Sequence, residues 1–223
     1  MRSQQSGFTL VEIAIVLVII GLLLGGILKG QELINSAKVK NLANDFRVIP
    51  TYIYAYQDKF KALPGDDCLA GTHVGTPAVD VSPCTAPAGN GVINGNWNST
   101  TTTDESFLFW QHVRLANLAA GPTSTTDTAY QPRNAVGGVI GITSATTTPA
   151  QTIAGITGTY LVCSGGILGK FAKQLDIQMD DGNTQTGSMR VVADGTGAGG
   201  TALATTGAGG VDDATAYTVC MGF

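Results

Sequence analysis

The chain is poor in charge, and basic residues are the scarcer kind. Only 13% of its 223 residues are charged, and 12 Lys and Arg stand against 16 Asp and Glu, which gives a net charge of −4. So small a charged fraction, beside 43% hydrophobic residues, excludes charge-driven disorder and a coiled-coil rod. The negative sign is wrong for neutralising phosphates, so we expect no nucleic-acid partner.

Catalytic sequence motifs are missing as well. The chain has only two histidines, His73 and His112, and neither a G-x-S-x-G nor an H-E-x-x-H motif. Residues 195–200 match G-x-G-x-x-G, but the residues that follow lack the helical periodicity that a dinucleotide-binding unit needs. We therefore expect no enzymatic activity and no required cofactor.

The charges and the threonines divide the chain near residue 61. Residues 1–61 hold seven basic and four acidic side chains, whereas residues 62–223 hold five and twelve. Of the 28 threonines, 26 lie beyond residue 60. Because threonine suits strands and exposed turns, we expect a helical first part and a β-rich second part in a wet environment.

A long apolar run lies near the start. Residues 8–28 are 21 consecutive positions at which Glu12 is the only ionisable side chain. A helix rises about 1.5 Å per residue, so this run covers the roughly 30 Å hydrocarbon core of a bilayer. It ends without the small-residue cleavage site of a secretory signal peptide, which favours a retained membrane helix. A plain anchor leaves Glu12 unexplained, because a carboxylate facing lipid is costly.

The beginning of this run carries a specific motif. Gly7, Phe8 and Glu12 stand in the string GFTLVE, with a short leader before it and an unbroken apolar run after it. This pattern resembles the N-terminal processing motif of type IV pilins and type II secretion pseudopilins. The resemblance implies that a membrane prepilin peptidase/methyltransferase cuts between Gly7 and Phe8 and methylates the new N-terminus. Residues 1–7 would be the leader peptide, and residues 8–28 the transmembrane and filament-core helix.

The same resemblance gives Glu12 a role. Cleavage creates a positive amine at Phe8, and Glu12 follows it by four residues, about one helical turn. In a low-dielectric bundle of helices, the amine and the carboxylate lower each other's cost of burial. The family therefore implies that Phe8 and Glu12 register each subunit against its neighbour. Lys29 stands where many major pilins carry proline, which favours a minor or pseudopilin-type subunit.

Residues 29–61 should continue the helix with one apolar face. Apolar residues recur there at steps of three and four, as along one side of a helix: Val39, Leu42, Phe46, Ile49, Ile53, Tyr56 and Phe60. We expect this amphipathic part to pack on a head formed by residues 62–223, and Pro50 to kink or interrupt the helix. The string ALPGDD at residues 62–67 ends the helix and resembles a segment common after the long helix in these families.

The head should combine a short helix with several strands. Residues 105–120 predict a helix, ended by Gly121 and Pro122. Apolar stretches between Gly, Thr, Asp and Asn clusters predict antiparallel strands at residues 136–142, 151–162, 189–192 and 216–219. The predicted fold class is α+β: a long N-terminal helix packed on a globular head with an antiparallel β-sheet.

Four cysteines lie in the head: Cys68, Cys84, Cys163 and Cys220. The head of such a protein lies outside the cytoplasm, so disulfides are the leading expectation. Four cysteines allow three pairings. We favour Cys68 with Cys84 and Cys163 with Cys220, because each pair joins a loop to a nearby structural element. A zinc site is disfavoured, because the chain has no C-x-x-C motif and its two histidines are far apart in sequence.

Oxygen-bearing side chains gather at residues 176–183. Asp176, Asp180, Asp181 and Asn183 surround a glycine turn, without the spacing of an EF-hand. Some type II pseudopilins bind calcium in the head, so calcium is the candidate ion. The alternative, which we favour, is that these Asp and Asn residues only initiate turns.

Two functions follow as hypotheses. The first is a structural subunit of a type IV pilus or type II secretion pseudopilus. Such a subunit spans the inner membrane once, with an extracytoplasmic head, and later joins like subunits in a periplasmic or cell-surface filament. The second is a membrane-anchored or pilus-tip adhesin whose Thr- and Gly-rich loops bind a ligand.

Overall fold

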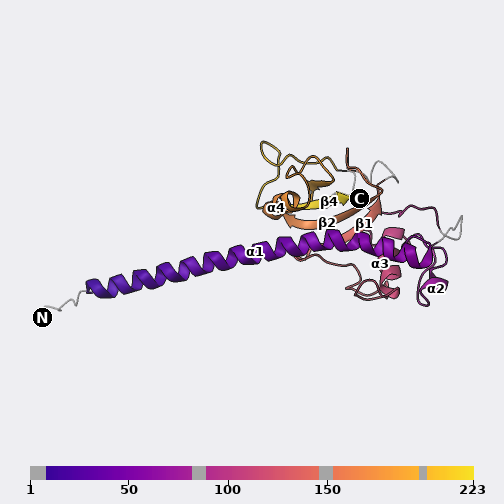
Figure 1. Cartoon of the computed structure of the whole chain (residues 1–223), viewed down its shortest axis with the longest axis horizontal. Coiled ribbons are helices and arrows are strands. Elements are labelled where there is room, and N and C mark those ends of the chain that lie inside the picture. Colours follow the sequence, from indigo (N-terminus) through magenta and orange to yellow (C-terminus); the bar gives the residue numbers. More distant parts are fainter. Residues whose placement is uncertain (1–8, 82–88, 146–152, 196–199) are drawn as a thin grey trace. The chain divides into compact units, whose positions relative to one another are not determined.

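The computed structural model describes residues 9–81, 89–145, 153–195 and 200–223. The chain divides into two compact units, Met1–Lys38 and Val39–Phe223, and one helix, α1 (Leu10–Phe60), contributes to both (Figure 1). The fold is α+β, as predicted: a long apolar N-terminal helix and a globular part with a four-stranded antiparallel sheet.

Within the first unit, α1 exposes its apolar side chains. Every large hydrophobic residue from Leu10 to Leu28 that the helix carries is exposed, between 46% and 91%. The mean hydropathy of its most apolar 18 residues is 2.8, and by length and composition the helix can cross a membrane. A helix that is hydrophobic on all sides suits lipid or the interior of a helical bundle, because water would solvate it poorly.

Within the second unit, α1 has one buried face. Its buried residues follow the predicted stripe and add one alanine: Val39, Leu42, Ala43, Phe46, Ile49, Ile53 and Tyr56. Phe60, the last predicted member, is only half-buried. The helix continues through Pro50, so of the two outcomes that we expected there, a kink or an interruption, the interruption is absent. Ile49 and Ile53 are both packed in the core, which holds the helix together where the Pro50 N–H is missing.

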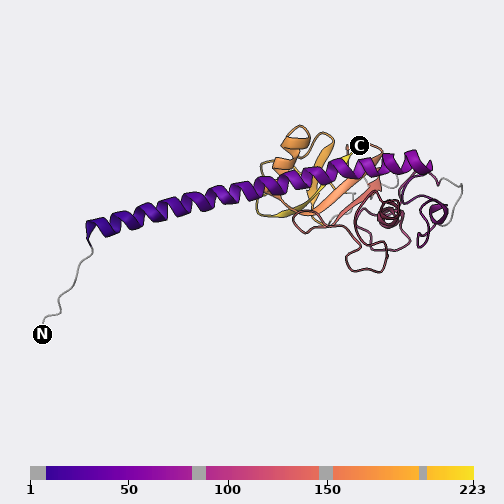
Figure 2. The same ribbon diagram turned by 60° about the horizontal axis from the view of Figure 1, so that its bottom comes forward.

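The sheet has the strand order β1-β2-β4-β3, and every neighbouring pair is antiparallel. Its strands are β1 (Ile140–Ser144), β2 (Tyr160–Leu168), β3 (Met189–Ala193) and β4 (Ala216–Gly222). Figure 2 shows the second half of α1 lying across the strands. Ile142, Val162 and Val219 lie in the same hydrophobic cluster as the buried stripe of α1, so this face of the sheet holds the main core.

The opposite face of the sheet is also covered. Leu161 and Cys163 of β2, Val192 of β3 and Cys220 of β4 form a second cluster with residues from loops, including Trp97. Successive residues of a strand therefore enter different cores, as the alternation of side chains requires. This explains why the strands carry near-continuous apolar runs rather than an apolar and polar alternation.

Two strand predictions were misplaced. The strand predicted at residues 151–162 begins only at Tyr160 and runs on to Leu168, while residues 151 and 152 lie outside the described part. The register of β2 against β4 shifts between Ser164 and Ile167, and Gly166 there has a φ of +68°. A bulge with glycine in the left-handed region lets the strand continue through a sequence that resembles a turn. The strand predicted at 136–142 is displaced too, because β1 starts at Ile140.

The helices of the head differ from the prediction in two ways. α3 (Glu105–Leu115) ends five residues early, since Asn117 has a left-handed φ of +60° and terminates it before Gly121. α4 (Gly169–Met179) was missed, although Phe171 and Leu175 of its buried face follow helical spacing. One more helix, the single-turn α2 (Ala70–His73), follows the ALPGDD segment.

The buried face of α1 generates a direct test. Ile53 is fully buried and its neighbour Tyr54 is 61% exposed. We predict that Ile53→Ala lowers the free energy of unfolding by about 2–5 kcal/mol, because it leaves a cavity in the main core. Tyr54→Ala, the control, should change it by less than about 0.5 kcal/mol. Urea unfolding of the full chain in detergent micelles measures both, and equal losses would contradict the packing.

Candidate functional site

The N-terminal motif is the first candidate site. Gly7 and Phe8 lie outside the described residues, so cleavage between them stays a prediction. Glu12 lies in the first turn of α1, on a stretch of helix whose side chains are exposed. It is the acidic residue of that turn, where the positive end of the helix dipole favours a carboxylate.

Glu12 and Thr9 cap the helix reciprocally. Glu12 Oε2 accepts hydrogen bonds from the Thr9 backbone N–H (2.9 Å) and from its hydroxyl (2.7 Å), and the Thr9 hydroxyl oxygen accepts one from the Glu12 N–H (3.3 Å). This is a capping box, in which a Thr and a Glu three residues later satisfy free N–H groups at the helix start. The sequence analysis missed it, although the T-x-x-E spacing was visible. Glu12 therefore has a structural role in the isolated chain besides the one that the family implies.

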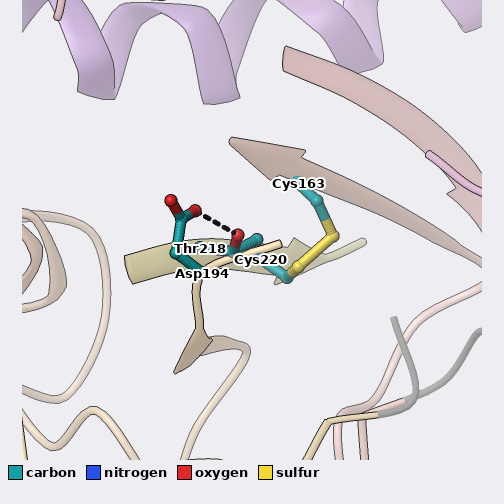
Figure 3. Close-up of a disulfide and its surroundings, with 4 residues drawn as sticks. All are labelled: Cys163, Asp194, Thr218 and Cys220. Carbon is teal, nitrogen blue, oxygen red and sulfur yellow. Dashed lines mark hydrogen bonds between the residues drawn. A yellow bond between two sulfur atoms is a disulfide. The ribbon is translucent and has the colours of Figure 1, made fainter. Parts of the chain in front are cut away.

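A disulfide joins two strands of the sheet. Cys163 of β2 and Cys220 of β4 are directly opposite in the antiparallel register, and they are bonded across 57 residues of sequence (Figure 3). This is one of the two pairings that the sequence analysis favours. The other stays a prediction, because Cys84 lies outside the described residues. Beside the disulfide, Thr218 donates a hydrogen bond to Asp194 (3.0 Å), which ties β4 to the residues after β3.

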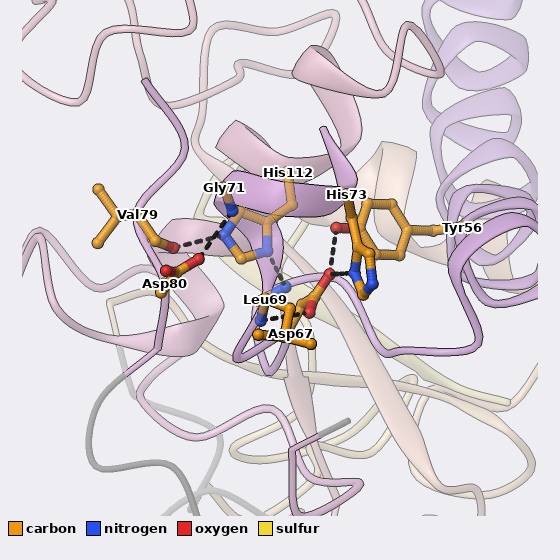
Figure 4. Close-up of polar contacts among 9 residues, drawn as sticks. Tyr56, Asp67, Leu69, Gly71, His73, Val79, Asp80 and His112 are labelled. Carbon is orange, nitrogen blue, oxygen red and sulfur yellow. Dashed lines mark hydrogen bonds and ion pairs between the residues drawn. The ribbon is translucent and has the colours of Figure 1, made fainter. Parts of the chain in front are cut away.

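The ALPGDD segment anchors the end of α1 through a buried carboxylate. Asp67 is fully buried, and its Oδ2 accepts a hydrogen bond from the Tyr56 hydroxyl (2.7 Å) and lies 2.6 Å from His73 Nδ1 (Figure 4). Its Oδ1 accepts the Leu69 N–H (2.9 Å). The Asp67 carboxylate thus links three parts of the head: α1 through Tyr56, the turn through Leu69, and α2 through His73. Burial raises the pKa of Tyr56, and the nearby Asp67 raises it further, so Tyr56 stays a proton donor.

The second histidine is fixed as a neutral ring. His112 Nδ1 accepts the Gly65 N–H (3.0 Å), so the ring proton lies on Nε2 and is donated to the Val79 carbonyl (2.9 Å; Figure 4). Burial lowers the pKa of His112, which favours this neutral form. Both ring nitrogens form hydrogen bonds with backbone groups, so His112 links the segments at Gly65 and Val79 and has a structural role.

The glycine-rich turn at residues 89–95 donates backbone N–H groups to two carboxylates. The N–H groups of Asn90 and Gly91 donate to the carboxylate of Asp66 (3.1 and 2.6 Å), and Glu105 accepts the Asn94 N–H (2.7 Å). Burial raises the pKa of Asp66, and these N–H groups offset part of the rise. The turn therefore binds these carboxylates through its N–H groups, while its carbonyls at residues 93 and 94 accept the N–H groups of Ser144 and Ser106.

Three of the four predicted calcium ligands come together. Oxygens of Asp176, Asp180 and Asp181 all lie within 4.8 Å of one another at the end of α4. Asp176 is fully buried, and neither of its carboxylate oxygens has a hydrogen-bond partner among the described residues. Asp180 accepts the Met189 N–H (2.7 Å), and Asp181 accepts the Thr186 hydroxyl (2.7 Å). A hard cation would satisfy the buried carboxylate.

Asn183, the fourth, forms a turn. Its side-chain oxygen accepts the Gln185 N–H (3.2 Å) and the Thr205 hydroxyl (3.4 Å). The turn alternative of the sequence analysis therefore describes Asn183, and also Asp181, whose Oδ1 accepts the Asn183 N–H (2.8 Å), whereas the buried Asp176 needs a different explanation. Burial, and after it the carboxylates of Asp180 and Asp181, raise the pKa of Asp176, and nearby N–H groups of residues 182 and 183 offset part of the rise, so that the pKa is about 6.

This carboxylate gives the metal-free chain a pH dependence. An unfolded Asp has a pKa of about 3.9, so the folded state binds this proton more tightly. The stability it contributes is complete below about pH 4 and is lost as pH rises through about 6. We predict that the free energy of unfolding in EDTA falls between about pH 4 and 6, and that Asp176→Asn removes about 1–3 kcal/mol of that fall. An unchanged pH profile in urea unfolding of Asp176→Asn would count against it.

Comparison with known proteins agrees with the position of the motif. Residues 2–28 match the family model of the prokaryotic N-terminal methylation motif. The comparison with curated proteins gives no match. The matched segment covers Gly7, Phe8 and Glu12 and continues along the exposed apolar part of α1. The chain therefore carries the N-terminal signature of type IV pilins and pseudopilins.

Proposed function

We propose that the chain is a structural subunit of a type IV filament, a pilus or a type II secretion pseudopilus. Prepilin peptidase cuts it between Gly7 and Phe8, and it polymerises with other pilin-like subunits through its N-terminal helix. The observation that carries the proposal is the methylation motif at residues 2–28. From Leu10 on, the matched residues lie in α1, a helix long enough to cross a membrane, and their apolar side chains are exposed.

The apolar part of α1 suits a subunit both in the membrane and in the filament. Before assembly, its exposed Leu, Ile and Val side chains are solvated by the lipid of the inner membrane. During assembly, they exchange lipid for the apolar helices of other subunits. That exchange changes the hydrophobic free energy little, so packing and polar contacts decide the register. Glu12, the acidic side chain of this stretch, supplies the polar contact with the amine of a mature Phe8.

The head belongs on the extracytoplasmic side. The Cys163–Cys220 disulfide supports this location, since disulfides persist in oxidising compartments. The structural uses of the Asp67 carboxylate and the His112 ring support a structural subunit rather than an enzyme. Lys29 lies within the uninterrupted α1 and pairs with Glu32 (2.6 Å), so the helix lacks the proline common in major pilins, which favours a minor subunit. A minor subunit at the filament tip would also accommodate the adhesin hypothesis.

Processing is tested at the cleavage site. We predict that Gly7→Leu leaves an uncut precursor in the membrane, because the peptidase of this family recognises the small residue before the cut. Peptide mass spectrometry identifies the first residue of the accumulated chain. Recovery of chains that begin at Phe8 from this variant would refute the cleavage assignment.

Assembly is tested by separating the charge of Glu12 from its capping. Glu12→Ala removes both, Glu12→Gln keeps a capping residue but loses the charge, and Thr9→Ala loses the cap but keeps the charge. We predict normal membrane insertion of all three. Incorporation into sheared filaments should fall at least about tenfold for both Glu12 variants, since each leaves a buried amine unpaired.

The threonine variant is the matched control for that test. Thr9→Ala should assemble nearly as well as the unaltered chain, because losing a cap costs only about 1 kcal/mol. Immunoblots of the sheared and membrane fractions compare the three variants. Normal incorporation of Glu12→Gln would contradict the charge pairing, and a Thr9→Ala defect as severe as that of Glu12→Ala would assign the effect to the helix cap.

We also propose that the acidic cluster of the head binds calcium. The observation that favours it is the buried Asp176 carboxylate, which has no hydrogen-bond partner in the part of the chain that the structure describes and lies beside Asp180 and Asp181. Burying an unpaired carboxylate is costly, and a bound cation offsets that cost. Calcium would stabilise the connection between α4 and β3.

Calcium binding has a stability readout. We predict that millimolar Ca²⁺ raises the Tm of the full chain and that Asp176→Asn abolishes the rise, because a ligand that binds the folded state stabilises it by mass action. Asp212→Asn is the control, since Asp212 accepts the Ala214 N–H in an exposed turn outside the cluster. An equal rise of Tm in Asp176→Asn, or no rise in the unaltered chain, would exclude the site.

A further inference from the structure

The part of α1 just beyond the apolar run carries an exposed apolar face. Gly30, Leu33, Ile34 and Ala37 recur at the spacing of one side of a helix. Leu33 and Ile34 are 62% and 58% exposed. All four residues follow the 21-residue run that fills the hydrocarbon core of a bilayer, so the membrane span alone does not account for this face.

This face lies on the other side of the helix from the stripe that the head buries. Leu33 and the buried Leu42 are nine residues apart, and so are Ile34 and the buried Ala43. Nine residues make about two and a half turns of an α-helix, which puts the members of each pair on opposite sides. Packing of the head on α1 therefore leaves Leu33 and Ile34 uncovered.

Lysines border the exposed face on both sides. At about 100° of rotation per residue, Lys29 and Lys40 project within about 40° of Leu33, and Lys38 projects within about 40° of Ile34. Glu32 is the single acidic residue of the segment 29–40, and it pairs with Lys29 (2.6 Å). An apolar face with basic borders is typical of a helix at the surface of an anionic membrane.

The position along α1 places this segment at the membrane surface. Leu33 and Ile34 follow Leu28 by five and six residues, which is about 8–9 Å along the helix axis. The headgroup layer on each side of the hydrocarbon core is about 5–8 Å thick. Membrane helices are tilted by about 20° on average, and a tilt lowers one side of the helix toward the bilayer. A tilt toward the apolar face brings Leu33 and Ile34 into the headgroup layer.

The lysine side chains lean in the same direction. Every Cα–Cβ bond of an α-helix tilts toward the N-terminus, and along α1 that is the direction of the apolar run. The ammonium groups of Lys38 and Lys40 therefore lie closer to the lipid phosphates than their Cα atoms do. Lys29 directly follows the last residue of the run. At physiological salt, charges attract one another over about 8 Å, so these lysines favour anionic headgroups.

The charges around the run oppose the usual topology signal. Lys and Arg concentrate on the cytoplasmic side of membrane proteins. In the topology proposed above, Arg2 is the one basic side chain before the run, whereas Lys29, Lys38 and Lys40 follow it on the extracytoplasmic side. Three lysines on that side disfavour the required orientation, so their presence indicates a use at that membrane surface.

We propose that residues 29–40 are a docking surface for anionic phospholipid of the membrane that α1 crosses. Leu33 and Ile34 lie in the headgroup layer, and Lys29, Lys38 and Lys40 contact the lipid phosphates. This contact sets the tilt and the depth of the helix before assembly. The inference rests on the membrane stage of the proposed function, and neither cleavage nor polymerisation enters it.

Tryptophan fluorescence tests the apolar face. The full chain with Ile34→Trp is reconstituted into vesicles of equal parts phosphatidylcholine and phosphatidylglycerol, and brominated lipid quenches any tryptophan that it contacts. Trp97 and Trp110 are 4% and 5% exposed, so they give an unquenched background. Ser36→Trp is the matched control, because Ser36 is exposed and about 200° around the helix from Ile34. We expect a large loss of fluorescence for Ile34→Trp and little for Ser36→Trp.

The lysines are tested in the Ile34→Trp chain. Brominating one lipid at a time gives the binding constant of phosphatidylglycerol relative to phosphatidylcholine at the introduced tryptophan. Lys38→Gln with Lys40→Gln should lower this ratio about fivefold or more, the effect of losing one lysine near an anionic surface. Lys59→Gln with Lys61→Gln removes the same charge about 28 Å further along the chain, and should change the ratio less than about twofold. High salt should abolish the lipid preference but not the quenching.

Three outcomes would overturn the proposal alone. They are equal quenching of the two tryptophan variants, an unchanged lipid preference in Lys38→Gln with Lys40→Gln, and quenching of Ile34→Trp that falls as the protein-to-lipid ratio rises. The last would assign this face to a second copy of the chain. In all three cases, chain that stays with the vesicles after an alkaline wash leaves the membrane stage of the proposed function intact, whereas chain that washes off would overturn both.

Discussion

The pairing of one carboxylate decides how the N-terminal helix is used. Glu12 begins a stretch of α1 that is otherwise apolar and exposed on all sides, and a charge there is costly in lipid unless it has a partner. In the isolated chain, Thr9 is that partner through the reciprocal cap. In a chain cut before Phe8, a free amine becomes available one helical turn away. The proposal of a filament subunit depends on this exchange of partners, because the apolar side chains alone do not distinguish a simple anchor from an assembly helix.

In the head, the same helix has a different role, which is to cover one face of the sheet. From Val39 onward, α1 presents one buried stripe to the sheet and exposes the rest. The sheet is buried on both faces, and the disulfide ties two of its strands on the face away from the main core. Buried carboxylates then hold the loops: Asp67 fixes the end of α1, and Asp66 fixes the glycine-rich turn at residues 89–95. Asp176 has no such partner among the described residues, and it lies in the cluster that we propose binds calcium.

Much of the fold could be predicted from local pattern. The steps of three and four between Phe46, Ile49 and Ile53 predicted the buried face of α1, and the apolar run at residues 8–28 predicted a membrane-length helix. The misses have physical causes. A bulge at Gly166 lets β2 pass through residues that resemble a turn, and Asn117 ends α3 before the expected glycine. The burial of Arg114 beside the rings of Trp110 and Tyr130 could not be predicted, because Tyr130 belongs to a separate loop segment and only packing brings it to Arg114. The unpartnered state of Asp176 likewise depends on the burial of one side chain at the end of a helix that the sequence analysis missed.

The most direct test of the central claim is the mass of the N-terminal peptide in two fractions of the native host, membranes and sheared surface material. The account predicts that the sheared fraction contains a mature chain beginning at a methylated Phe8, and its yield would separate a major from a minor subunit. An intact chain that begins at Met1 and is confined to the membrane fraction would contradict the account and favour a plain membrane-anchored module.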